Sequence, residues 1–114
     1  MITIKGIDPK MIANNLSPYR PIHPGEILKD EIEYRGISQR KLAEQMEVSY
    51  TVLNEILNCK RPVNTEFALF IEAALDIEAD TLLRMQTSYN IQIAKQNKTF
   101  INRFNKIRKV GVFL

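Results

Sequence analysis

The segment from Gln39 to Leu57, QRKLAEQMEVSYTVLNEIL, constrains the fold more than any other part of the chain. Apolar side chains recur at helical spacing on both sides of a break at Glu47 and Val48, and Ser49 is suited to cap a new helix. Two helices this short are unstable alone in water, so they must pack on each other and on a third element. The segment therefore predicts a helix, a sharp turn and a second helix in close contact.

Such a pair is a helix-turn-helix, whose second helix can lie in the major groove of DNA. Because Val52, Leu53 and Ile56 must point inward, the other side chains of the second helix face solvent. The residues predicted to read base edges are Tyr50, Thr51, Asn54 and Glu55.

The chemistry of this exposed face is compatible with DNA. Asn54 can pair bidentately with adenine, the Thr51 methyl group can touch thymine, and Glu55 can accept from cytosine. Phosphates would be contacted by cations and by the free amides at a helix N-terminus. The residues predicted to contact the DNA backbone are Arg40, Lys41, Ser49, Lys60 and Arg61. For each basic residue, ordinary solvated charge is the alternative.

Caps and apolar spacing predict the other helices. The first starts at Pro24, after His23 as a structural cap, carries Ile27 in its buried stripe and ends before Gly36. Further helices follow the expected caps Ser38, Ser49, and Asn64 or Thr65, and a fifth begins near Glu78. We expect an all-α fold, a compact bundle of five helices, with a possible extra C-terminal helix that carries Phe100, Phe104 and Ile107.

Charge divides the chain into segments of different character. Residues 62–94 hold five acidic residues and one basic residue, whereas residues 95–114 hold six basic residues and no acidic one. We expect an N-terminal arm over 1–21, a helix-turn-helix domain over 22–94 and a basic extension over 95–114. The extension could bind phosphate, fold on a partner or remain solvated.

The composition argues against an enzyme. The chain has one cysteine and one histidine, so it offers neither a disulfide nor a cluster of metal ligands, and no Gly-rich phosphate loop occurs. We therefore predict no catalytic residue, metal or cofactor. The start of the chain does not read as a signal peptide and no apolar run could span a bilayer, which predicts a cytoplasmic protein.

Several motifs are shared with a known family. They are Ile22–Leu28 (IHPGEIL), Gly36–Gln39 (GISQ), Lys41–Ala43 (KLA) and Val48–Ser49 (VS). With these motifs the chain resembles the HigA family of antitoxins, also called VapI-like, within the Xre/Cro group of helix-turn-helix regulators. The resemblance covers roughly residues 20–93. It departs from the family pattern at Glu47, where glycine is usual, so that a non-glycine residue is expected there at a positive φ. It also departs at Asp76, Glu78 and Leu82, where the family often shows Gly, Ser and Trp.

The resemblance implies a lambda-repressor-like domain that binds double-stranded operator DNA and neutralises a HigB-like, mRNA-cleaving toxin. It also implies the same base-reading positions and adds Gln39 as a backbone contact. A stand-alone Xre-family regulator without a toxin is the alternative, and a toxin-neutralising module that no longer reads DNA is another.

A single helix-turn-helix reads only a few base pairs, so specific binding generally requires a homodimer on a palindromic site. The candidate dimer interface is an apolar stripe formed by Leu82, Met85, Tyr89 and Ile93. Packing of this stripe within its own monomer is the alternative.

Overall fold

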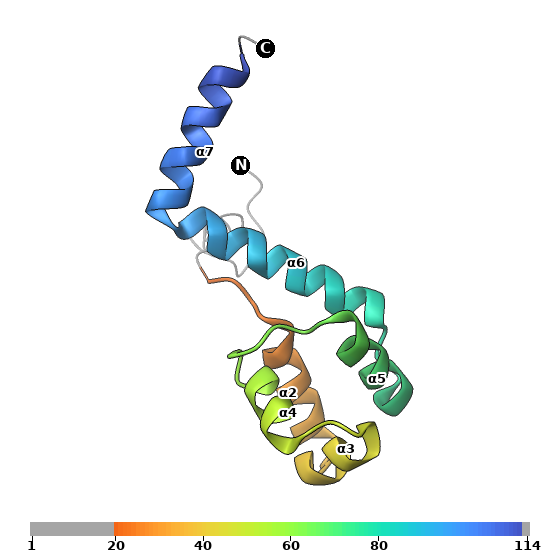
Figure 1. Cartoon of the computed structure of the whole chain (residues 1–114). Coiled ribbons are helices and arrows are strands. Elements are labelled where there is room, and N and C mark those ends of the chain that lie inside the picture. Colours follow the sequence, from red (N-terminus) through yellow and green to blue (C-terminus); the bar gives the residue numbers. More distant parts are fainter. Residues whose placement is uncertain (1–19, 113–114) are drawn as a thin grey trace, which may run out of the picture.

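The computed structural model describes residues 20–112, which form six α-helices and no strand. The helices are α2 (Pro24–Tyr34), α3 (Gln39–Met46), α4 (Tyr50–Leu57), α5 (Thr65–Leu75), α6 (Ala79–Gln96) and α7 (Lys98–Gly111) (Figure 1). The prediction of an all-helical protein is confirmed. The predicted N-terminal arm lies outside the described residues, apart from its last two positions.

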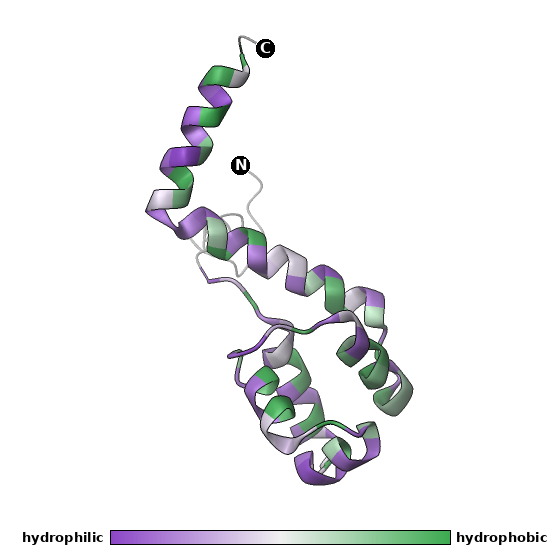
Figure 2. Cartoon of the chain, viewed as in Figure 1, coloured by the Kyte–Doolittle hydropathy of each residue, from purple (hydrophilic) through white to green (hydrophobic). Residues whose placement is uncertain are grey.

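The core lies where α2, α3, α4 and α5 meet the first half of α6 (Figure 2). Its most completely buried large side chains are Leu28, Ile32, Leu42, Leu53, Leu57, Ile71 and Leu82. Ile27 was predicted to share the buried stripe of α2, but it is 45% exposed. It lines a surface groove between α2 and α6, so α6 covers this side of α2 only in part.

Side-chain caps begin most of the helices, as their sequences predicted. The hydroxyl groups of Ser38 and Ser49 accept hydrogen bonds from backbone amides in the first turns of α3 and α4, and Asn64 does the same for α5. Each cap satisfies a donor that a helix start leaves unpaired. Glu78 precedes α6 without a side-chain capping bond.

The tight turns place several residues in the left-handed region. Gly36 has a φ of 66°, and Glu47, at the turn of the helix-turn-helix, has a φ of 57°. The positive φ predicted for Glu47 is confirmed, and Asp76 also has a positive φ, of 58°. A third such residue, Cys59 at 64°, was not expected.

The bundle is less compact than predicted, because its C-terminal part projects from the core. Beyond the core α6 continues with exposed side chains, of which Ile91 is 50% and Ile93 43% exposed. Asn97 then joins it to α7, which extends away from the other helices and packs chiefly against α6 (Figure 1). None of the described helices is both long and apolar enough to cross a membrane.

Candidate nucleic-acid interface

The turn between α3 and α4 is closed by backbone geometry and small side chains. The Val48 amide donates to the Ala43 carbonyl at 3.0 Å, and Ala43 is buried, which lets the two helices approach closely. Leu53 and Ile56 hold α4 against the core from its inner face. The outer face of α4 is thereby presented to solvent on a rigid support.

A close contact between α2 and α4 sets the position of α4. A Cβ atom built on Gly25 would lie 1.9 Å from the carbonyl oxygen of Ile56, so only glycine fits here. This contact gives a physical reason for the glycine in the motif at residues 22–28. The motif therefore serves to seat the N-terminus of α2 against the C-terminal turn of α4.

His23 ties the same region to α6. Its Nδ1 accepts from the Gly25 amide at 2.9 Å, which confirms the predicted cap, and its ring meets Tyr89 edge-to-face at 4.9 Å between centroids. Burial lowers the pKa of His23 below its ordinary value, while a backbone hydrogen bond with Arg61 and the charge of Glu26 oppose that shift. The neutral imidazole is thus the form that the fold accommodates.

The N-terminal end of α4 carries two of the predicted base-reading residues, and both are exposed. The guanidinium carbon of Arg40 lies 4.5 Å from the centre of the Tyr50 ring, a cation–π contact that links α3 to α4. Thr51 is exposed beside Tyr50, and Ser49 has its hydroxyl engaged with the Val52 amide.

Asn54 is half-buried within a polar network. Its Nδ2 donates to Oε1 of Gln39 at 3.3 Å, so the base-reading candidate on α4 meets the backbone-contact candidate on α3. Asn58 donates to Oδ1 of Asn54 at 3.2 Å and accepts from Lys29 at 3.2 Å. Asn58 and Lys29 were not predicted as part of the site. The signal for Asn58 was its four-residue spacing from Asn54, which places both on one face of a helix, whereas Lys29 comes from a distant helix and had no such signal.

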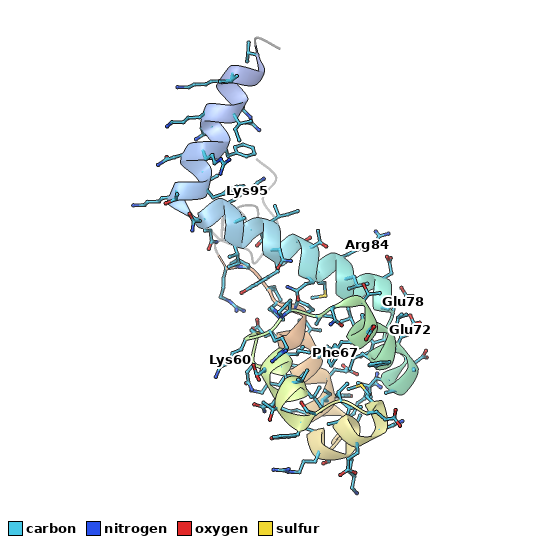
Figure 3. The ribbon with its side chains drawn as sticks, viewed as in Figure 1. Lys60, Phe67, Glu72, Glu78, Arg84 and Lys95 are labelled. Atoms are coloured by element: carbon cyan, nitrogen blue, oxygen red, sulfur yellow. The ribbon has the colours of Figure 1, made fainter. Side chains whose placement is uncertain are left out.

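Glu55 is also half-buried, and it pairs with Arg61, with 3.5 Å between the carboxylate oxygen and the guanidinium nitrogen. All four base-reading candidates were predicted to face solvent. Tyr50 and Thr51 are exposed, and Asn54 and Glu55 are partly exposed. Lys41 and Lys60 are exposed at the border of this face, and Figure 3 labels Lys60 on the loop that follows α4. The structure thus gathers the predicted residues of α3, α4 and that loop on one surface.

The candidate dimer stripe is divided between the core and the surface. Leu82 is only 2% exposed and packs in the core of its own monomer, so it is not available as an interface residue. Met85 and Tyr89 are half-buried along a groove, and Ile93 is exposed beyond it. The reason is that α6 crosses the core with its first half only.

Known proteins share both the sequence and the fold. Residues 28–82 match a family described as helix-turn-helix. Virulence-associated protein I of Dichelobacter nodosus is 38% identical over 82 residues, which span 71% of this chain and 76% of that protein. Among solved structures, antitoxin GraA is 36% identical with a TM-score of 0.64, over 68% of this chain and 84% of that one. The Pseudomonas aeruginosa antitoxin HigA, solved with the higBA promoter, is 33% identical with a TM-score of 0.64, over 68% and 85%.

Proposed function

The chain belongs to the HigA-like (VapI-like) family of Xre-type helix-turn-helix proteins, and from this premise we propose that it is a sequence-specific DNA-binding antitoxin that represses its own operon. The observation that carries the proposal is the outer face of α4, which presents polar side chains from a rigidly seated helix. A similar antitoxin has been solved with its promoter.

Asn54 is the residue to which we assign most of the base selectivity. Its amide has two N–H donors and two acceptor lone pairs. Gln39 and Asn58 use one of each, which leaves one donor and one acceptor. Those are the groups that bidentate pairing with adenine requires, and the network fixes the orientation of the amide before DNA arrives.

Other residues would hold the DNA backbone or extend the reading. Thr51, with its exposed methyl group, is the candidate for a thymine contact, and Tyr50 and Glu55 lie beside it on α4. The phosphate contacts would come from Gln39, Arg40, Lys41, Ser49, Lys60 and Arg61, which border that face. Phosphate contacts fix the register of a protein on DNA, and base contacts then select the sequence.

The proposal includes a homodimer on a palindromic operator and neutralisation of a small, mRNA-cleaving, HigB-like toxin. Such toxins are basic, and the acidic residues of 62–94 offer a surface of opposite charge. A stand-alone regulator would share every DNA-binding feature and would differ only in lacking the toxin.

A gel-shift titration against the region upstream of the gene, at 150 mM salt as a working condition of roughly physiological strength, tests the DNA-binding part. Asn54→Ala is expected to weaken binding roughly 5- to 150-fold, the range for one bidentate base contact. Thr51→Ala should weaken it less. Glu44→Ala, an exposed change on α3 outside the proposed surface, is the control and should bind as the parent does. Unchanged binding by Asn54→Ala would overturn the assigned reading face.

Co-expression with the product of the adjacent gene tests the antitoxin part. A small basic protein that co-purifies in a stoichiometric complex, and whose mRNA cleavage is suppressed in that complex, supports the proposal. If the chain binds its upstream DNA but no neighbouring product binds the chain, it is a stand-alone regulator.

A further inference from the structure

Helix α7 carries an apolar stripe that the described part of the chain leaves largely uncovered. Phe100, Phe104 and Ile107 follow one another at spacings of four and three residues, and so lie on one face. Phe100 is 44% and Ile107 62% exposed. A helix of 14 residues is marginal in water unless its apolar face is packed, so this stripe calls for a partner.

The chain's own geometry prevents α7 from folding back along α6. Only Asn97 joins the two helices, and it is extended, with φ −83° and ψ 119°. Its side chain accepts from the Phe100 amide at 2.9 Å and so caps α7 in that position. Two antiparallel helices need a connection of about two to five residues. The partner of the stripe must therefore come from elsewhere.

An apolar groove of suitable character lies between α2 and α6. This α2–α6 groove has a volume of about 430 Å³, and its lining residues are Arg20, Ile22, Ile27, Thr81, Arg84, Met85, Ser88, Tyr89 and Gln92. Both arginines are paired with a carboxylate, Arg20 with Glu26 and Arg84 with Asp80, each at 2.9 Å. Ile22 and Ile27 are 48% and 45% exposed.

The two ends of α6 lie in segments of opposite charge. Every charged residue from 95 to 114 is basic, whereas acidic residues dominate α5 and the start of α6. Figure 3 places Glu72 and Glu78 at the end of α6 that is far from Lys95 and α7. When two copies lie with their α6 helices antiparallel, the basic end of each copy comes next to the acidic end of the other.

From these features we propose that α7 of each copy docks in the α2–α6 groove of a second copy. The exchange is reciprocal, so the interface is two-fold symmetric and closed. The Phe100–Ile107 stripe covers the apolar groove, and the basic flank of α7 meets the acidic residues of the partner. The inference rests on the dimer of the proposed function and names the surfaces that make it.

Sedimentation velocity without DNA tests the role of α7. The full chain is expected to be a dimer at micromolar concentration, and Ile107→Asp should weaken dimerisation by about 30-fold or more, a loss of roughly 2 kcal/mol. Asn102→Asp, on the opposite face of α7, adds the same charge and should remain dimeric. Because Ile107 is exposed in the monomer, its variant should unfold at the same temperature as the dissociated parent. A monomeric parent, or a variant that dimerises as the parent does, would overturn the proposal.

Disulfide trapping tests the groove, in a Cys59→Ser background that removes the native thiol. Protein with Ile107→Cys and protein with Ser88→Cys, a groove residue, should form a mixed cross-linked dimer when combined. Cross-linking of Ile107→Cys with itself alone would show that α7 pairs with α7. No cross-link at all would show that α7 of a second copy does not occupy the groove. Both results contradict the proposal.

The two proposals fail in distinguishable ways. If the Asn54→Ala variant is dimeric and binds DNA as the parent does, the assignment of the base-reading residues is wrong, but the proposed α7 exchange is not affected. If the Ile107→Asp variant is dimeric and binds operator DNA as the parent does, the proposed α7 exchange is wrong, but the proposed DNA-binding function is not affected.

Discussion

At the scale of single residues, three turn positions hold residue types that are poorly suited to their backbone conformation. Glu47, Cys59 and Asp76 all adopt a positive φ without being glycine. The left-handed region costs an ordinary L-residue about 1–2 kcal/mol, less for aspartate, whose side chain can bond locally. Glu47 and Cys59 therefore have more stability to gain from replacement than Asp76.

We expect Glu47→Gly to stabilise the protein by up to about 1 kcal/mol, because it removes the cost of the positive φ while it adds some freedom to the unfolded chain. Glu44→Gly is the matched control, since it removes the same side chain from the helical interior of α3, and it should destabilise by about 1 kcal/mol. Urea unfolding of both variants gives the comparison. A loss of stability in Glu47→Gly as large as in the control would contradict the strain argument.

His23 makes stability depend on pH. Burial lowers its pKa below the ordinary 6.5, so as the pH falls below that value the unfolded chain binds the proton more readily than the folded one. The stabilisation is complete above about pH 6.5 and is lost as the pH falls through the folded pKa. Protonation would also replace the Nδ1 acceptor by a donor facing the Gly25 amide.

Urea unfolding at pH 7.5, 6.5 and 5.5 should show this loss for the parent chain, which has a single histidine. His23→Asn keeps a side-chain acceptor at the cap and does not titrate, so its stability should be lower overall but flatter over the same range. Equal pH dependence in the two proteins would assign the effect to carboxyl groups instead.

At the scale of elements, the crossing of α2 over α4 depends on one missing side chain. Gly25→Ala would place a methyl group against the Ile56 carbonyl, where backbone cannot yield as a side-chain end can. We expect a loss of about 3 kcal/mol or failure to fold. Gly111→Ala, which meets nothing within 4 Å, is the control and should be neutral or slightly stabilising. Similar small effects in both variants would show that α2 can shift freely.

The elements differ in how far the sequence predicts them. Caps such as Ser38 and Ser49, and the apolar spacing of α4, act within a few residues, so the helices and the inward-facing side of α4 could be assigned without a structure. Contacts between distant segments could not. The network around Asn54, the burial of Leu82 and the exposure of Ile27 all depend on where α6 crosses the core, which no local pattern encodes.

At the scale of the whole molecule, the reading surface and α7 lie at opposite ends of the chain's long axis (Figure 1). The basic residues consequently fall into two groups with separate proposed roles. The proposals assign those around α3 and α4 to DNA, and those of α7 to the acidic part of a second copy. This separation gives the strongest test of the assembly, because each phosphate contact increases the dependence of DNA affinity on salt concentration.

The slope of log K against log salt counts neutralised phosphates, at about 0.9 per contact. In a dimer, Lys41→Gln with Lys60→Gln removes four contacts, so the slope should decrease in magnitude by about 3.6, against about 1.8 for a monomer. Lys95→Gln with Lys98→Gln removes the same charge near the α6–α7 junction and should leave the slope at saturating dimer unchanged. An equal decrease in both double variants would make α7 a DNA-binding arm, and its apolar stripe would then need a different explanation from docking on a second copy.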